Sequence, residues 1–219
     1  MPFNDVSKNL MLDAMDESLA TGIDFIGIFQ VGADPGTSTN HTGTEATGGS
    51  PVYARQGVVW GAAASGQKAN TGALTFDVPA GSYYAFGLFN ANTGNSGTFL
   101  GYIPFGGSSA IKGFASSDVV ANDAFWSAAH GLSNGNTVLV YNVFAEALPT
   151  GTGLTEGALL YVVGATTDSF QLSTTSGGAA INVTATGEFY WQRVVPEVFA
   201  SQGQITVAAG ALVLEMTAI

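Results

Sequence analysis

Hydrophobic residues recur at every second position in several short stretches of this chain, which is the pattern of β-strands. In Leu-Thr-Phe-Asp-Val at 74–78 the alternation is strict, so the three apolar side chains are predicted to face a core. Residues 23–31 are β-branched and aromatic on both faces, which is typical of a largely buried strand. Turn residues at 92–97 separate two further runs, so residues 82–105 are predicted to form a hairpin.

The same pattern, interrupted by Gly, Pro and Asn, predicts strands along most of the chain. Residues 5–19 instead carry apolar side chains at helical spacing, which predicts one short N-terminal helix. The expected fold class is mainly β, with a β-sandwich or barrel-like domain following that helix. The predicted strands are residues 23–31, 52–60, 73–78, 82–90, 98–105, 137–143, 158–163, 169–172, 180–184, 188–194, 203–207 and 212–216.

Two polar stretches interrupt these strands. Residues 32–51 are rich in Gly, Thr and Ser and predict a long loop of the kind that is often functional. Gly106-Gly107-Ser108-Ser109 predicts a flexible boundary, after which a second β-rich unit begins.

Three groups of residues carry a resemblance to a known family. They are Ser-Pro-Val-Tyr-Ala-Arg-Gln at 50–56 with Trp-Gly-Ala-Ala-Ala-Ser-Gly at 60–66, Phe-Asp-Val-Pro-Ala-Gly at 76–81 with Phe-Gly-Leu-Phe at 86–89 and Gly-Thr-Phe-Leu-Gly at 97–101, and Gln-Gly-Gln-Ile-Thr-Val-Ala-Ala-Gly-Ala-Leu at 202–212. Together they resemble small structural proteins of tailed bacteriophages, of the tail-fibre-like or head-decoration type. The resemblance implies one compact β domain behind a short N-terminal helix.

A second resemblance lies between the second and third of these groups. It is carried by Ala-Ala-His-Gly-Leu-Ser-Asn-Gly-Asn-Thr-Val at 128–138, Leu-Pro-Thr-Gly at 148–151 with Leu154, Leu-Tyr-Val-Val at 160–163, Asp-Ser-Phe-Gln-Leu-Ser at 168–173 and Gly-Gly-Ala-Ala at 177–180. This stretch resembles a small β module that is frequent in phage tail and adsorption proteins and is likened to a domain of ubiquitin-activating enzymes. The two resemblances imply a base domain of residues 1–117 and 194–219 with a small β domain, residues 118–193, inserted near its C-terminal end.

Charged residues are scarce. Five Lys and Arg stand against sixteen Asp and Glu in 219 residues, which gives a formal net charge of −11. This balance argues against nucleic acid as a partner, because phosphate contacts need basic side chains. Cys is absent, which excludes disulfides, thiolate metal sites and thiol nucleophiles. We expect no membrane partner, because no apolar run reaches ~18–20 residues, and no signal peptide is predicted.

Residue types that carry catalysis or bind metals stand without the partners that such chemistry needs. His41 lies in the polar loop and His130 precedes a turn, so both are predicted to be structural. Residues 61–68 have the glycine spacing of a phosphate-binding loop, but Gln67 stands where the lysine is needed. We expect no catalytic, cofactor-binding or metal site, and no enzyme. A Ca²⁺ site or carboxylate pair assembled from separate loops is left open.

Aromatic residues mark the candidate interaction surface. Consecutive strand residues point to opposite faces, so at least one ring of Phe189-Tyr190-Trp191 is predicted to leave its own core. Such a ring would serve as a platform for a sugar or as an anchor against a neighbouring loop or subunit. The candidate interaction residues are Phe189, Tyr190, Trp191, Trp126, Tyr83 and Tyr84.

Three functional hypotheses follow. The first is a non-enzymatic structural protein of a tailed-phage virion, assembled in the host cytoplasm and exposed on the particle as a capsid decoration (cement or head fibre) or tail-fibre-type component. Its expected partners are major capsid or tail proteins and copies of itself, with a trimer as the candidate state. The second is a carbohydrate- or host-surface-binding (adsorption) protein, with a host surface glycan bound by residues 118–193. The third, a glycan-cleaving enzyme, lacks any carboxylate pair that the sequence singles out.

Overall fold

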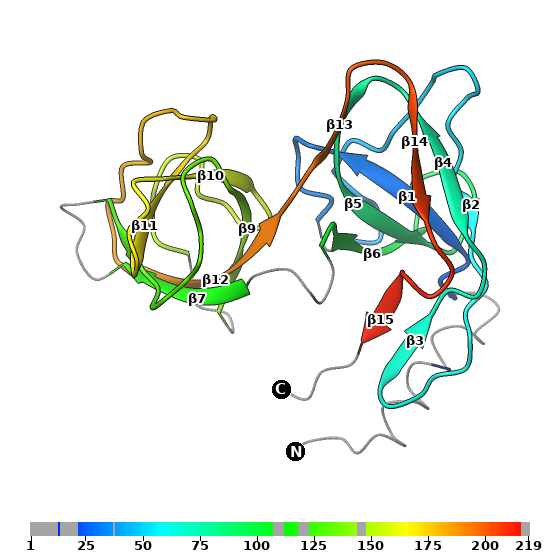
Figure 1. Ribbon diagram of the computed structural model, residues 1–219, viewed down its shortest axis with the longest axis horizontal. Helices are drawn as coiled ribbons and strands as arrows, with labels where there is room; N and C mark the ends of the chain where they lie inside the picture. The colour runs from blue at the N-terminus through cyan, green and yellow to red at the C-terminus, as the bar shows by residue number, and fades with distance from the viewer. Residues whose placement is uncertain are drawn as a thin grey trace. The chain divides into compact units, whose positions relative to one another are not determined.

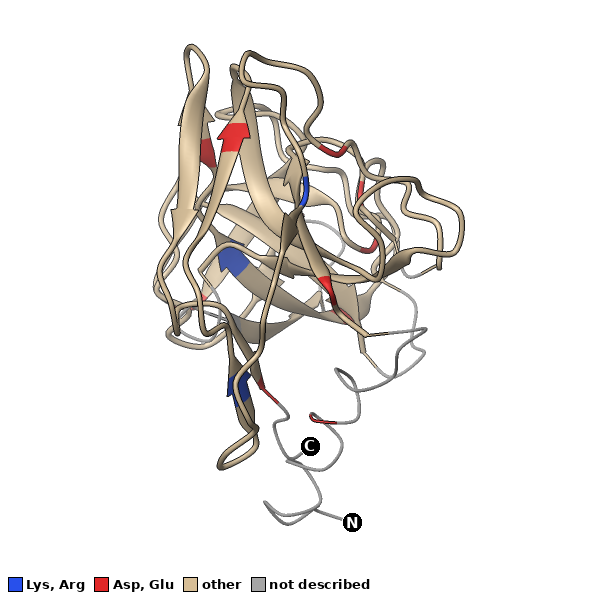
Figure 2. Ribbon diagram, turned by 90° about the vertical axis from the view of Figure 1, so that its right-hand side faces the viewer, with Lys and Arg blue, Asp and Glu red and all other residues tan. Residues whose placement is uncertain are grey.

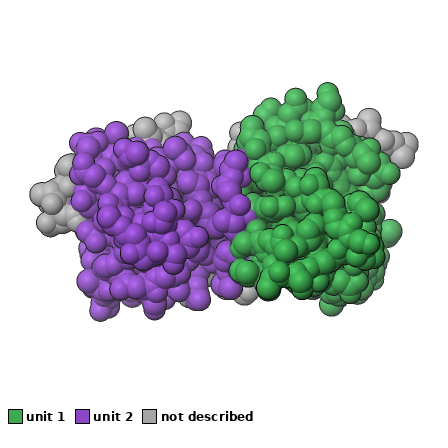
Figure 3. Space-filling view, turned by 90° about the horizontal axis from the view of Figure 1, so that it is seen from above, with its two compact units in different colours: residues 1–30, 35–107, 197–219 green, residues 31–34, 108–196 purple. Residues whose placement is uncertain are grey.

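The computed structural model describes residue 13 and residues 22–36, 38–106, 112–117, 123–143 and 148–215 (Figure 1). These residues are mainly β, as the sequence predicts. The chain divides into two compact units (Figure 3). Unit 1 comprises Met1–Gln30, Pro35–Gly107 and Glu197–Ile219, and unit 2 comprises Val31–Asp34 and Ser108–Pro196.

Unit 1 is built on a five-stranded sheet with β1 (Phe25–Gln30) and β5 (Gly81–Phe89) at its centre. The buried middle of β1 explains its β-branched and aromatic sequence, since apolar side chains cover both of its faces. The predicted hairpin is confirmed, because β6 (Phe99–Pro104) pairs antiparallel with β5. Two short strands complete the sheet, β2 (Gln56–Gly57) on β1 and β13 (Glu197–Phe199) on β5.

Two strand pairs outside this sheet bring the C-terminal segment back to unit 1. β14 (Gly203–Val207) pairs with β4 (Leu74–Val78), and β15 (Val213–Glu215) pairs with β3 (Gln67–Ala69). The apolar side chains of β4 are buried, as its strict alternation predicts. They join one hydrophobic core with members of β1, β5 and β14, among them Ile26, Ile28, Leu74, Phe76, Val78, Tyr83 and Ile205.

Unit 2 is a closed barrel with the strand order β10-β11-β8-β7-β12-β9. Its interior is filled by apolar residues from every strand, among them Ala115, Phe125, Val140, Val162, Phe170, Leu172, Phe189 and Trp191. The ring closes through antiparallel ladders, of which β12 makes the longest with β7 and β9. The strands are β7 (Lys112–Ser117), β8 (Phe125–Trp126), β9 (Thr137–Asn142), β10 (Leu159–Val163), β11 (Ser169–Ser173) and β12 (Gly187–Val194).

Some elements differ from the expectation. Residues 180–184 form no strand and contribute one isolated bridge, Gly151↔Val183, and residues 52–60 contain only the two-residue β2. The expected second unit began at residue 118, whereas β7 precedes that position and pairs with β12 in the barrel. The expected helix at residues 5–19 lies outside the described residues, apart from Asp13.

The long polar loop expected at residues 32–51 is fastened to unit 1 by a buried ion pair. Arg55 donates from Nε and from Nη2 to the two carboxylate oxygens of Glu45, over 2.8 and 2.7 Å. The Tyr53 hydroxyl donates to Glu45 Oε1 over 3.0 Å and accepts the Ile28 N–H. The guanidinium also lies 3.4 Å from the ring centre of Phe89. These contacts give the loop a fixed conformation at Glu45.

A candidate binding face on the barrel

The three consecutive aromatic residues of strand β12 point alternately into the barrel and out of it. Phe189 and Trp191 are 0% and 1% exposed and fill the barrel core, whereas Tyr190 is 41% exposed. The prediction that one ring of this triplet leaves the core is confirmed, and that ring is Tyr190. The period-two geometry of a strand is the cause.

Neighbouring strands place further aromatic rings beside Tyr190 on the outer surface. Tyr190 lies directly opposite Tyr141 of β9 on one side and Phe114 of β7 on the other. The rings of Phe114 and Tyr190 have centroids 5.8 Å apart and an interplanar angle of 66°. This edge-to-face arrangement is the favourable geometry for an aromatic pair. Phe114 is 40% exposed, so the pair forms an apolar surface open to solvent.

Trp126 extends this surface onto a fourth strand. It is 54% exposed and lies opposite Ser116 of β7 and Ser169 of β11. Because Ser116 is two residues from Phe114 on the same face of β7, Trp126 is the diagonal neighbour of Phe114, at the ~7–8 Å typical of such pairs. We call Tyr141, Tyr190, Phe114 and Trp126 the aromatic face.

A shallow cavity of about 380 Å³ opens at the aromatic face. Polar side chains flank it on β12, where Glu188 is exposed and Gln192 is half-buried, two positions to either side of Tyr190. Glu188 lies opposite Ser116, which in turn lies opposite Trp126, and Gln192 lies opposite Lys112, so the row of Tyr190 and Phe114 is bordered by an acidic residue on one side and by a basic residue on the other. The residues lining the cavity are Gly113, Phe114, Tyr141, Tyr190, Trp191 and Gln192.

The barrel interior holds the aromatic face in place from behind. The indole N–H of Trp191 donates to Ser127 Oγ over 3.2 Å, and that hydroxyl donates to the Phe114 carbonyl oxygen over 2.6 Å. Trp191 and Ser127 are both buried, so these bonds are shielded from water. They link β12, β7 and the residue that follows Trp126, which fixes the relative positions of three of the four rings.

The remaining candidate residues do not join this face. Tyr83 and Tyr84 are buried in unit 1, where the Tyr83 hydroxyl donates to the Pro79 carbonyl oxygen and burial raises the pKa of Tyr83. Phe189 supports the face from inside the barrel, and Trp191, although buried in the same core, also lines the cavity. Sequence reasoning missed Phe114 and Tyr141, because their positions beside Tyr190 depend on strand register.

Both histidines contact backbone groups. His130 accepts the Leu132 N–H at Nδ1 over 3.0 Å and faces the Ser169 carbonyl oxygen with Nε2 at 3.2 Å. This arrangement assigns the proton to Nε2 of a neutral ring. His41 Nδ1 lies 2.9 Å from the Gly43 carbonyl oxygen. Within the described residues, no group of three or more metal-ligating side chains is assembled.

The described part of the chain also holds no helix long and apolar enough to span a membrane. Charged residues are few and lie scattered along the ribbon (Figure 2). Among the side chains that the structure describes, the two buried basic ones each have an acidic partner: Arg55 pairs with Glu45, and Lys68 lies 3.0 Å from Asp13 Oδ1. The hydrogen bond from the Ala63 N–H, and next that from the Lys68 ammonium, lower the pKa of Asp13.

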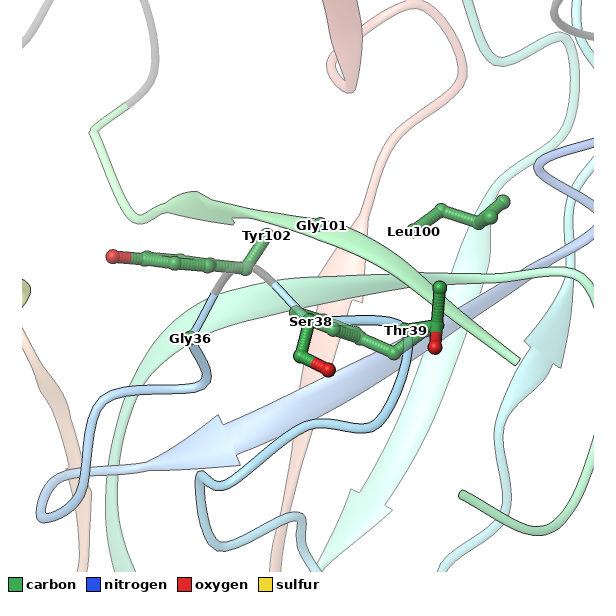
Figure 4. Close-up of a pocket in the computed structure, with 7 residues that line it drawn as sticks. Gly36, Ser38, Thr39, Leu100, Gly101 and Tyr102 are labelled. Carbon is green, nitrogen blue, oxygen red and sulfur yellow. The ribbon is translucent and has the colours of Figure 1, made fainter. Parts of the chain in front are cut away.

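Unit 1 has a cavity of its own, of about 410 Å³, between the loop residues Gly36, Ser38 and Thr39 and strand β6. Figure 4 shows the hydroxyl groups of Ser38 and Thr39 on the loop and the side chains of Leu100 and Tyr102 on β6. The loop is attached there, because the Phe99 N–H donates to the Thr39 carbonyl oxygen. Three large side chains of β6 line this cavity: Phe99 is buried, Leu100 is exposed and Tyr102 is half-buried, so the cavity lacks the row of exposed rings found on the barrel.

Comparison of the chain with protein-family models, with curated proteins and with solved structures finds no match.

Proposed function

We propose that this protein is a non-enzymatic surface-binding protein whose barrel unit binds carbohydrate through the aromatic face. The observation that carries the proposal is the set of exposed rings of Tyr190, Phe114 and Trp126 on adjacent strands, with polar side chains at their borders. Aromatic rings pack against the C–H faces of sugars, while neighbouring polar groups accept bonds from sugar hydroxyls. Large exposed apolar side chains gathered in one place mark binding sites more often than single ones do.

The proposed setting is the surface of a tailed-phage particle, with the protein as a capsid decoration or tail-fibre-type component. This part of the proposal is supported by the sequence resemblances. Unit 1 would contact the major capsid or tail proteins and neighbouring copies, and unit 2 would carry the adsorption function. The scarcity of charge suits repeated subunits packed side by side, because interface cores are depleted of charged residues.

A glycan array probed with the full chain tests the binding proposal. We expect binding that is lost in a variant with Tyr190→Ala and Phe114→Ala and is kept in Tyr102→Ala, which removes an aromatic ring from unit 1 instead. Thermal unfolding of each variant checks that the barrel is intact. Equal binding by the wild type and by the folded double variant would contradict the proposal.

Electron microscopy of virions labelled with an antibody against the chain tests the setting. We expect label at regular positions on the capsid or the tail. Particles of the producing phage that carry no label would overturn the virion assignment and leave the carbohydrate proposal to be decided by the array.

A further inference from the structure

We infer that Ser127 is a positioning residue of the carbohydrate site, because its buried hydroxyl group holds Trp126 and Phe114 in the arrangement in which a ligand meets them. This inference rests on the proposed function and deepens it. Ser127 is 4% exposed and bonds to the core residue Trp191, so it lies behind the aromatic face. The affinity of the site therefore depends on a side chain that the ligand does not contact.

The chemistry of the partners fixes the direction of both hydrogen bonds of this hydroxyl group. The indole N–H of Trp191 can only donate, so Ser127 Oγ accepts it, over 3.2 Å. The Phe114 carbonyl oxygen can only accept, so the hydroxyl proton points to it, over 2.6 Å. Each bond polarises the other, and burial of Trp191 and Ser127 shields them from water. This chain of bonds thus ties β12 firmly to β7.

Trp126 needs this support because its own strand has few ladder pairs. β8 has two residues, and in the described part of the chain one pair, Ser116 with Trp126, joins it to β7. β12 has six pairs with β7. The Ser127 hydroxyl adds a second attachment of this segment to β7, at Phe114, and the Ser127 N–H adds one to the Asp168 carbonyl oxygen, over 2.8 Å. The residue after Trp126 therefore supplies attachments that the short strand lacks.

The attachment at Phe114 determines how the exposed rings are spaced. Phe114 and Trp126 are diagonal neighbours on β7 and β8, and Phe114 also packs edge to face with Tyr190. Without the Ser127 hydroxyl, the Trp191 N–H and the Phe114 carbonyl oxygen both lose a partner, and β8 is free to shift against β7. The rings would remain exposed, but binding would then have to fix the position of Trp126, which lowers affinity.

Titration of the protein over the same glycan array measures the effect of Ser127→Ala. We expect the apparent affinity to fall on the order of fivefold, which corresponds to about one hydrogen bond. Ser127→Cys should give an intermediate affinity, because a thiol of similar size donates and accepts hydrogen bonds weakly. Ser173→Ala is the matched control. It removes a hydroxyl of the same barrel that is 1% exposed and accepts the Thr175 N–H at the end of β11, and we expect it to keep the wild-type affinity.

The indole N–H signals in a proton–nitrogen correlation NMR spectrum separate positioning from a general loss of stability. The chain has three Trp residues, and each indole reports on a different place. Trp191 bonds to Ser127, Trp126 lies on the aromatic face, and Trp60 donates to the Ile23 carbonyl oxygen in unit 1. We expect Ser127→Ala to move the signals of Trp191 and Trp126 and to leave that of Trp60 in place.

Urea unfolding checks that each variant is folded, and Ser127→Cys carries the comparison if Ser127→Ala is not. Wild-type affinity in a folded Ser127→Ala, an equal loss of affinity in Ser173→Ala, or an unmoved Trp126 signal would overturn the inference while the proposed function stands. Failure of the wild-type chain to bind any glycan would overturn both.

Discussion

Gly113 and Trp191 lie directly opposite each other on β7 and β12, and the indole ring occupies the space where a side chain at residue 113 would begin. A Cβ atom at Gly113 would come within 2.7 Å of Trp191 Cζ2, closer than such atoms approach in folded proteins. Trp191 is fully buried among other aromatic rings, so it has little room to move away. The glycine therefore lets the largest core side chain pass beneath the aromatic face.

Gly113→Ala is accordingly expected to lower the free energy of unfolding of the barrel by about 1–3 kcal/mol, the usual result of overpacking a tight core. Urea unfolding followed by tryptophan fluorescence measures the change. Gly72→Ala is the control, since a Cβ there meets nothing within 4 Å, and we expect it to change stability by less than about 0.5 kcal/mol. Equal stability of Gly113→Ala and wild type would show that the ring has freedom to shift.

The strands that could be predicted from the sequence are those with a strong alternating pattern. β4 and β12 alternate large apolar and other residues, and both were expected within a residue or two. β7 has the sequence Lys-Gly-Phe-Ala-Ser-Ser, in which the single large apolar residue, Phe114, points outward. Such a strand carries no signal of its own and is held by its partners, chiefly β12. β8 has two residues, too few for any periodicity.

The aromatic face was also predictable only in part, because only some of its residues lie in strands with a recognisable alternating pattern. The exposure of one ring in Phe189-Tyr190-Trp191 follows from strand geometry, and Trp126 was among the candidate interaction residues. Which rings accompany Tyr190 depends on the register of β12 with β9 and β7. Register follows from how the barrel closes, and pairs of residues distant in sequence leave no local pattern.

Arg55 is expected to be essential for the stability of unit 1. Its guanidinium binds both oxygens of Glu45, donates to the carbonyl oxygens of Ala91 and Gly94, and packs on Phe89. Arg55→Met would leave the Glu45 carboxylate largely buried without its counter-ion, at a cost of about 3–5 kcal/mol. Urea unfolding measures this loss.

Glu197→Gln is the control for the Arg55 variant, because it removes a negative charge from an exposed position of unit 1 and is expected to change stability by less than about 0.5 kcal/mol. Arg55→Lys should also be clearly destabilised, since an ammonium group cannot bind the carboxylate and both carbonyl groups in the same plane. A loss below about 1 kcal/mol in Arg55→Met would contradict the role given to this ion pair.

Tyr53 is expected to make unit 1 sensitive to alkali. Burial, and next the charge of Glu45, raise the pKa of Tyr53 above the ordinary value. A raised pKa means that the fold favours the neutral hydroxyl, so its contribution is complete below pH ~10 and is lost as the pH rises further. The free energy of unfolding should therefore fall steadily above that pH.

Urea unfolding between pH 8 and pH 11 tests this sensitivity, with Tyr53→Phe as the comparison. The variant loses the hydrogen bonds of the hydroxyl with Ile28 and Glu45, which should lower stability by about 1 kcal/mol at pH 8. Its stability should then decline less steeply than that of the wild type above pH 10, with the part due to buried Tyr83 remaining. Parallel curves would exclude Tyr53 as the source.

Unit 1 is expected to fold without the barrel. The two hydrophobic cores share no residue, which indicates that each unit is stabilised from within. The chain leaves unit 1 after β6 and re-enters it at β13, and both strands pair with one edge of β5. Pro104 lies opposite Ala85 there, and Glu197 lies opposite Tyr83. Two residues along a strand span about 7 Å, so a few Gly and Ser residues can replace residues 108–196 without strain.

We expect this shortened chain to unfold cooperatively and to keep the Arg55–Glu45 pair, so that Arg55→Met destabilises it as it does the full chain. Calorimetry measures the transition, and loss of all carbohydrate binding in the shortened chain would agree with a binding face on the barrel. Residues 31–34 belong to unit 2 and would become exposed in the shortened chain. We expect this to lower its free energy of unfolding without abolishing the cooperative unfolding transition. A shortened chain without a cooperative transition would show that the base of this protein needs the barrel in order to fold.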